Sequence, residues 1–118
     1  MKNIFFLVLF VSFFNSYGQN YDALIKKADS CYNAKQYKKA TEFYTKAFQV
    51  DPNSKKNFYN AACASSLAND KKKSLDWLEI AVNNGFNSID HISSDADLDN
   101  IRKEKKLKKI IDNLQISI

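Results

Sequence analysis

Glycine, proline, histidine and cysteine are all scarce in this chain of 118 residues. The sequence holds two glycines, one proline, one histidine and two cysteines. A β-sandwich or β-barrel would need turn residues at short, regular spacing, and so few glycines and prolines exclude that pattern. Lysine, alanine and leucine, which favour helices, are common instead. We therefore predict an all-α protein with the size of one small domain.

The same scarcity restricts the chemistry that the chain can perform. His91 is the only histidine, so any serine or cysteine nucleophile would have to use it as its base. Cys31 and Cys63 fall in expected helices and show no zinc-ligand spacing with His91, and no glycine-rich phosphate loop is present. We predict no enzyme activity, no catalytic residue, no metal ligand and no cofactor. We expect two unpaired thiols, although the sequence leaves their oxidation state open.

Three alternating aspartates near the C-terminus suggest a calcium loop at first sight. Asp95, Asp97 and Asp99 have the spacing of the first ligands of such a loop. The loop would then require glycine and glutamate where Asn100 and Lys106 stand. Because aspartate is also a favoured helix cap, we interpret these residues as caps.

The first residues have the pattern of a secretory signal. Lys2 precedes an apolar run over residues 4–14, and Ser16 and Gly18 supply the small side chains that signal peptidases recognise. We predict a signal peptide over residues 1–18, cleaved after Gly18, and a mature protein in the periplasm or secreted. The alternative is a retained membrane anchor. Eleven residues rise only about 16 Å as a helix, roughly half the hydrocarbon thickness of a bilayer, so cleavage is favoured.

An internal repeat follows. A shift of about 34 residues superimposes apolar residues on apolar residues. The matching pairs are Leu24 and Phe58, Ala28 and Ala62, Tyr44 and Leu78, Ala47 and Ala81, and Phe48 and Val82. Small residues recur where two helices would approach closely, and aromatic residues supply the bulk beside them. The small residues are Ala28, Ala40, Ala62 and Ser74, and the bulky ones are Phe43, Tyr44, Phe48, Phe58, Trp77 and Leu78.

This period resembles that of the tetratricopeptide repeat (TPR) family, whose repeat is a pair of antiparallel helices. The first repeat, residues 21–54, carries most of the family pattern, including Pro52 near its end. The second, residues 55–87, lacks the closing proline and has Ser74 where the family has alanine. We expect helices over about residues 21–34, 37–50, 55–68 and 71–84. Ser54 is the expected cap of the third, Asn69 and Asp70 separate the third from the fourth, and Asn84 and Gly85 follow the fourth.

Residues 88–118 do not continue the repeat. The same shift would place Asp95, Asp99 and Lys108 at buried positions. We predict instead a short helix near residues 96–102, capped by Ser94 or Asp95, and a longer helix over about residues 103–115. Its apolar face combines Leu107, Ile110, Ile111 and Leu114. This connector and its capping helices would cover the open end of the second repeat.

The resemblance also implies where a partner would bind. TPR arrays bind on the concave face that the first helix of each repeat lines. Two tyrosines, an isoleucine and mixed charges there suit an extended peptide or a helix. We do not expect the carboxylate clamp of chaperone-tail binders, because Ile25 and Asp29 occupy two of its positions and only Asn60 matches. The candidate groove residues are Asp22, Ile25, Asp29, Tyr32, Lys56, Tyr59, Cys63 and Ser66.

The predicted function is a non-enzymatic, exported protein-interaction module, a scaffold or adaptor in an envelope complex. Its partner would be a protein or peptide whose identity the sequence leaves open. One alternative is a self-associating structural protein, such as a homodimer paired through its uncovered first helix. Another, less favoured, is a peripheral lipid binder that uses the basic residues of 102–109. Export argues against a nucleic-acid partner for that cluster.

Overall fold

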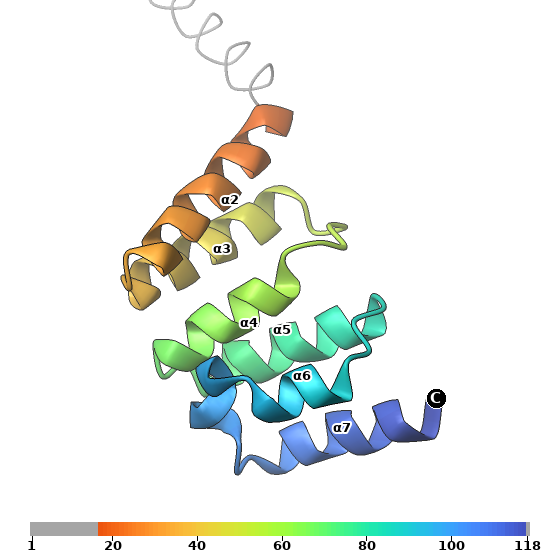
Figure 1. The fold of residues 1–118 in the computed structure, drawn as a ribbon. Coiled ribbons are helices and arrows are strands. Elements are labelled where there is room, and N and C mark those ends of the chain that lie inside the picture. The colour runs from red at the N-terminus through yellow and green to blue at the C-terminus, as the bar shows by residue number, and fades with distance from the viewer. Residues whose placement is uncertain (1–16, 118) are drawn as a thin grey trace, which may run out of the picture.

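The computed structural model describes residues 17–117, which form helices joined by turns (Figure 1). No strand occurs in this part of the chain, so the predicted all-α fold is confirmed. The helices are α2 (Tyr17–Asn33), α3 (Tyr37–Val50), α4 (Phe58–Leu67), α5 (Lys71–Asn83), α6 (Ile89–Ser94), the 3-10 helix η1 (Ala96–Ile101) and α7 (Lys105–Ser117).

The predicted signal peptide lies outside the described residues, apart from its last two positions at the start of α2. None of the helices that the structure describes is both long and apolar enough to cross a bilayer.

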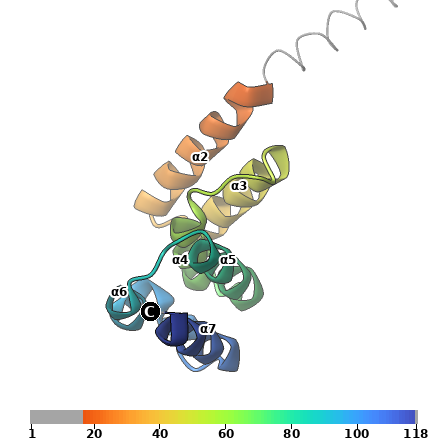
Figure 2. The ribbon, with the colours of Figure 1, turned by 90° about the vertical axis from the view of Figure 1, so that its right-hand side faces the viewer.

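Two helical hairpins stack on each other. Helix α2 packs against α3, α4 packs against α5, and α3 joins the hairpins by packing on α4. Figures 1 and 2 show the hairpins as successive layers, with α6, η1 and α7 beyond the second. The four small residues predicted at the close approaches, Ala28, Ala40, Ala62 and Ser74, are all completely buried. Small side chains therefore let the helices of each hairpin approach closely.

Aromatic rings fill the space between the hairpins. Phe48 of α3 stacks on Phe58 of α4 with ring centroids 4.0 Å apart, and its edge meets Trp77 of α5 at 5.3 Å. Tyr44 and Leu78 are completely buried beside them. The predicted core is thus confirmed, and its interlocking aromatic contacts hold the second hairpin on the first.

Positive φ angles end three of the helices. Lys35 after α2, Asn69 after α4 and Gly85 after α5 have φ values of 62°, 61° and 114°. In each case the backbone N–H of the following residue donates to a carbonyl five residues earlier, which is the Schellman arrangement. The predicted stop at Gly85 and the predicted boundary at Asn69 and Asp70 are both found, and the Asp70 side chain also caps α5 by accepting from the N–H of Lys73.

Helix α4 begins three residues later than predicted. Its N-terminal flanking residue is Asn57, with φ of 74°, so the predicted cap by Ser54 is wrong. The Ser54 hydroxyl instead forms a hydrogen bond of 2.6 Å with the Tyr21 hydroxyl of α2. This contact ties the connection between the hairpins to the first helix.

The C-terminal segment contains one helix, α6, that was not predicted from the sequence. Helix α6 is capped by Ser88, whose hydroxyl accepts from the N–H of His91. The predicted helix near residues 96–102 is the 3-10 helix η1, and Asp95 caps it by accepting from the N–H of Asp97. The side chains that hold this segment are completely or almost completely buried in the core shared with α4 and α5. They are Ile92, Leu98, Ile101 and Leu107.

Candidate functional site

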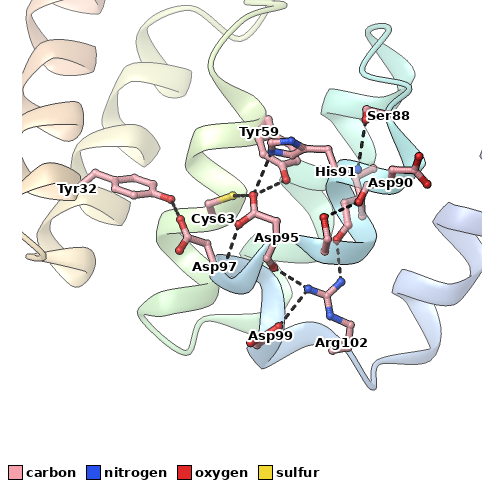
Figure 3. Close-up of polar contacts among 12 residues, drawn as sticks. Tyr32, Tyr59, Cys63, Ser88, Asp90, His91, Asp95, Asp97, Asp99 and Arg102 are labelled. Atoms are coloured by element: carbon pink, nitrogen blue, oxygen red, sulfur yellow. Dashed lines mark hydrogen bonds and ion pairs between the residues drawn. The ribbon is translucent and has the colours of Figure 1, made fainter.

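The concave face of the stacked hairpins is partly filled by the chain's own η1. The hydroxyl of Tyr32, from α2, donates to Asp97, and the hydroxyl of Tyr59, from α4, donates to Asp95 at 2.7 Å. The Asn100 side-chain amide donates to the Ser66 carbonyl of α4 at 2.8 Å. Figure 3 shows both tyrosines pointing toward the aspartates. Polar groups in and beside η1 thus occupy donors and acceptors on this face that could otherwise bind a peptide.

Asp95 is the centre of this arrangement. One carboxylate oxygen accepts from the N–H of Asp97 at 3.0 Å, and the other accepts from Tyr59 and from the Cys63 thiol at 3.7 Å. The Nε2 atom of His91 lies 3.4 Å from that second oxygen. Burial alone would raise the pKa of Asp95, but these hydrogen bonds and the nearby imidazole outweigh it and lower the pKa. Asp95 is therefore a carboxylate at neutral pH.

Cys63 is a buried thiol with two carboxylates beside it. Burial, followed by the charges of Asp95 and Asp97, raises the pKa of Cys63 to about 12. The side chain therefore stays a thiol at neutral pH and donates to Asp95. Burial and the accepting carboxylates likewise raise the pKa values of Tyr32 and Tyr59, so both phenols remain donors.

An aromatic cluster covers the other side of Asp95. Tyr59 stacks on Phe86 with ring centroids 4.1 Å apart, and His91 meets the two rings edge-on at 5.3 Å and 5.9 Å. Arg102 then joins α6 to η1, because its guanidinium donates to the carbonyls of Ile92 at 2.7 Å and Asp95 at 2.6 Å. These contacts fix the position of Asp95 from both sides.

The structure places the eight predicted groove residues in different environments. Ile25, Cys63 and Ser66 are buried, so their side chains do not line an open surface. Tyr32 and Tyr59 are half-buried and hold η1, as described above. The remaining three differ: Asp29 accepts a hydrogen bond from the Tyr44 hydroxyl, whereas Asp22 and Lys56 are exposed.

One half of the concave face stays open. A hollow of about 360 Å³ lies between α2 and α4, lined by Asp29, Tyr32, Asn33 and Asn60. From the sequence, Asn60 was only one match to a carboxylate clamp, and Asn33 was not among the predicted groove residues. Asp95, Asp97 and Asn100 were not predicted to occupy the other half. The alternation of Asp95, Asp97 and Asp99 was the available signal, but helix capping explained it equally well.

The basic residues of 102–109 do not form one uniform surface. Arg102 is held by backbone carbonyls, and Lys106 pairs with Asp76 at 2.7 Å and with Glu79 at 3.5 Å. The remaining basic side chains are exposed. They are Lys103, Lys105, Lys108 and Lys109.

Comparison with known proteins identifies the first hairpin. A family model described as tetratricopeptide repeat matches residues 21–54, the segment that contains α2 and α3. Residues 21–54 are a TPR repeat. TPR repeats generally mediate protein–protein contacts. The second hairpin, α4 and α5, packs on this repeat through α3 and α4. That residues 55–87 are a second repeat stays a prediction. No curated protein and no solved structure matches the chain.

Proposed function

We propose that this protein is a non-enzymatic, exported interaction module that serves as a scaffold or adaptor in an envelope complex. The observation that carries the proposal is the open half of the concave face beside a TPR hairpin. The partner would be a protein or peptide, bound at the hollow that Asp29, Tyr32, Asn33 and Asn60 line. Export rests on the sequence pattern of residues 1–18.

The lining of the hollow suits a peptide backbone. The side-chain amides of Asn33 and Asn60 each donate and accept hydrogen bonds, as peptide groups require. The nearby Asp29 is already oriented by the Tyr44 hydroxyl, so its carboxylate has a fixed position. Such preformed polar groups reduce the entropy lost on binding.

The filled half of the face is a poor second site. Leu98 and Ile101 of η1 are completely buried. Exposing either side chain would cost about 1.5–3 kcal/mol, so a partner gains little by displacing η1. We therefore assign the partner to the open half.

Affinity capture with charge variants tests this assignment. The chain, tagged at its C-terminus, is recovered from envelope extract of its source as wild type, as an Asn33→Arg, Asn60→Arg double variant, and as Asn83→Arg. Asn83 is exposed on α5 and serves as the control. We expect wild type and control to recover the same partner and the double variant to lose it. Recovery of the same proteins by all three would remove the groove assignment.

The export part has its own test. The N-terminal residue of the protein recovered from the envelope should be Gln19, which intact-mass measurement distinguishes from an uncleaved chain. A mature protein that retains residues 1–18 would contradict the proposed signal peptide.

Lipid binding is a second candidate, because Lys103, Lys105, Lys108 and Lys109 are exposed in or just before α7. Cosedimentation with anionic vesicles should then be strong at low salt and weak at high salt. Binding that does not change with salt would exclude this mode. Self-association through α2 is not supported by an exposed apolar surface on that helix. Among the described residues, the exposed large hydrophobic side chains are Ile80 of α5 and Ile116 of α7.

A further inference from the structure

Three metal-ligating side chains meet where η1 lies on α4, and His91 lies beside one of them. Cys63 comes from α4, His91 from α6, Asp95 from the junction of α6 and η1, and Asp97 from η1 (Figure 3). The thiol sulfur of Cys63 and carboxylate oxygens of Asp95 and Asp97 all lie within 4.8 Å of one another. The folded chain thus gathers a sulfur donor, an imidazole and two carboxylates from three elements.

Two of the separations, both measured from one oxygen of Asp95, are close to those of a tetrahedral site. Zinc binds sulfur at about 2.3 Å and oxygen or nitrogen at about 2.0 Å, which places neighbouring ligand atoms roughly 3.3–3.6 Å apart. The Cys63 sulfur lies 3.7 Å, and the His91 Nε2 atom 3.4 Å, from the same oxygen of Asp95. His91 lies outside the three donors that are all within 4.8 Å of one another, so its ring would have to turn to share an ion with them.

The carboxylates of Asp95 and Asp97 are not neutralised by a lysine or arginine among the described residues. Arg102 is nearby, but it donates to the main-chain carbonyl of Asp95 and to the side chain of Asp99. The two carboxylates beside a buried thiol therefore favour a divalent cation.

The carboxylates are also held in place by neighbours that are not themselves ligands. Tyr59 donates to Asp95, and Tyr32 donates to Asp97. Metal sites generally use such outer hydrogen bonds to orient their ligating carboxylates. The two carboxylates are thus oriented before an ion enters.

We propose that Cys63, His91, Asp95 and Asp97 bind a divalent transition metal of the zinc type. The sulfur donor favours zinc-like ions over calcium or magnesium, which take oxygen ligands. On binding, the S–H bond of Cys63 breaks, its proton leaves to solvent and a sulfur–metal bond forms. The ion would fasten η1 to α4. The sequence could not show this because Cys63 and Asp95 are 32 residues apart and meet only in the fold.

Cobalt is the probe that reports the sulfur ligand directly. The reduced full chain is titrated with Co²⁺, and thiolate coordination is followed by the near-ultraviolet sulfur-to-cobalt charge-transfer absorption, then by displacement with Zn²⁺. The chain supplies its own control, because Cys31 is the other cysteine and lies outside the cluster. We expect the absorption in wild type and Cys31→Ser, and its loss in Cys63→Ser. Saturation with Zn²⁺ should raise Tm by about 10 °C at a hundredfold excess over Kd.

A second variant covers the case in which Cys63→Ser does not fold. Asp97→Asn keeps the shape of a half-buried side chain and should weaken Co²⁺ binding about tenfold or more, with unchanged helix content by circular dichroism. His91→Ala should weaken it similarly. Wild type without charge-transfer absorption at millimolar Co²⁺, or equal affinity in Asp97→Asn, would overturn the site. Equal affinity in His91→Ala would overturn the assignment of the fourth ligand.

Discussion

Arg102 offers the sharpest test of how the C-terminal segment is held. Its guanidinium donates to the carbonyls of Ile92 and Asp95, while its side chain is 30% exposed. The Ile92 carbonyl lies in the last turn of α6, where helical partners run out. Arg102 therefore acts as a side-chain cap for α6 and, through Asp95, fixes the start of η1.

The magnitude follows from the two hydrogen bonds. Charged hydrogen bonds contribute about 1.5–3 kcal/mol each, and the partial exposure of the side chain favours the lower end. Its pair with Asp99 adds little because the Asp99 side chain is 70% exposed. We expect Arg102→Ala to lower the free energy of unfolding by about 3 kcal/mol, which corresponds to a fall in Tm of about 12 °C. Arg102→Lys can restore only one of the two bonds and should lose about half as much.

Urea titration followed by far-ultraviolet circular dichroism measures these differences. Lys103→Ala is the matched control, since Lys103 is the exposed neighbour and should change stability by less than about 0.5 kcal/mol. A loss in Arg102→Ala no larger than in Lys103→Ala would refute the role of the guanidinium. Wild-type stability in Arg102→Lys would refute the two-carbonyl geometry.

Three further predictions concern other parts of the molecule. Leu98→Ala should lower the free energy of unfolding by about 2–5 kcal/mol, because Leu98 is completely buried. A change below about 1 kcal/mol in urea titration would contradict its place in the core. Hydrogen bonds from Lys106, then Lys72, lower the pKa of Asp76 below 3.8, so that the stability from this pair is present above that pH and disappears as pH falls through the folded pKa. Lys106→Met should therefore lower the free energy of unfolding by less than about 1 kcal/mol at neutral pH, since both partners are roughly 40% exposed. In acid, below the folded pKa of Asp76, the variant and wild type should have the same stability. A difference in stability that persists there would argue against the pair. In the folded apo protein, a thiol-alkylating reagent should label half-buried Cys31 before Cys63, as followed by peptide mass spectrometry, and equal labelling rates would contradict the burial of Cys63.

The repeated part of the fold was predictable because its signals are local and periodic. Ala28 and Ala62 mark the close approaches, and both are completely buried. Asp70 and Gly85 mark helix boundaries through capping chemistry that depends on a few neighbouring residues. The predicted start of α4 was wrong because Asn57 adopts a left-handed conformation, which the sequence around Ser54 does not indicate.

The candidate site was less predictable because it depends on contacts between distant segments. Tyr32 and Asp97 are 65 residues apart, and Tyr59 and Asp95 are 36 apart. The position of the tyrosines on the concave face follows from the repeat. What covers them does not, because the repeat does not continue into residues 88–118 and so gives no position for η1 on the concave face. Helix α6 was missed for the same reason, as six residues are too few to show a helical period.

The C-terminal segment determines which part of the concave face remains available. A simple capping helix would need only apolar contacts with the last hairpin, such as those that Leu98 and Ile101 make. Here η1 also reaches across to α2 through the hydrogen bond between Tyr32 and Asp97. One tyrosine therefore serves both halves of the face, since Tyr32 also lines the open hollow with Asn33. Because the open and filled halves share this side chain, anything that tightens or loosens η1 also changes the wall of the hollow that a partner would contact.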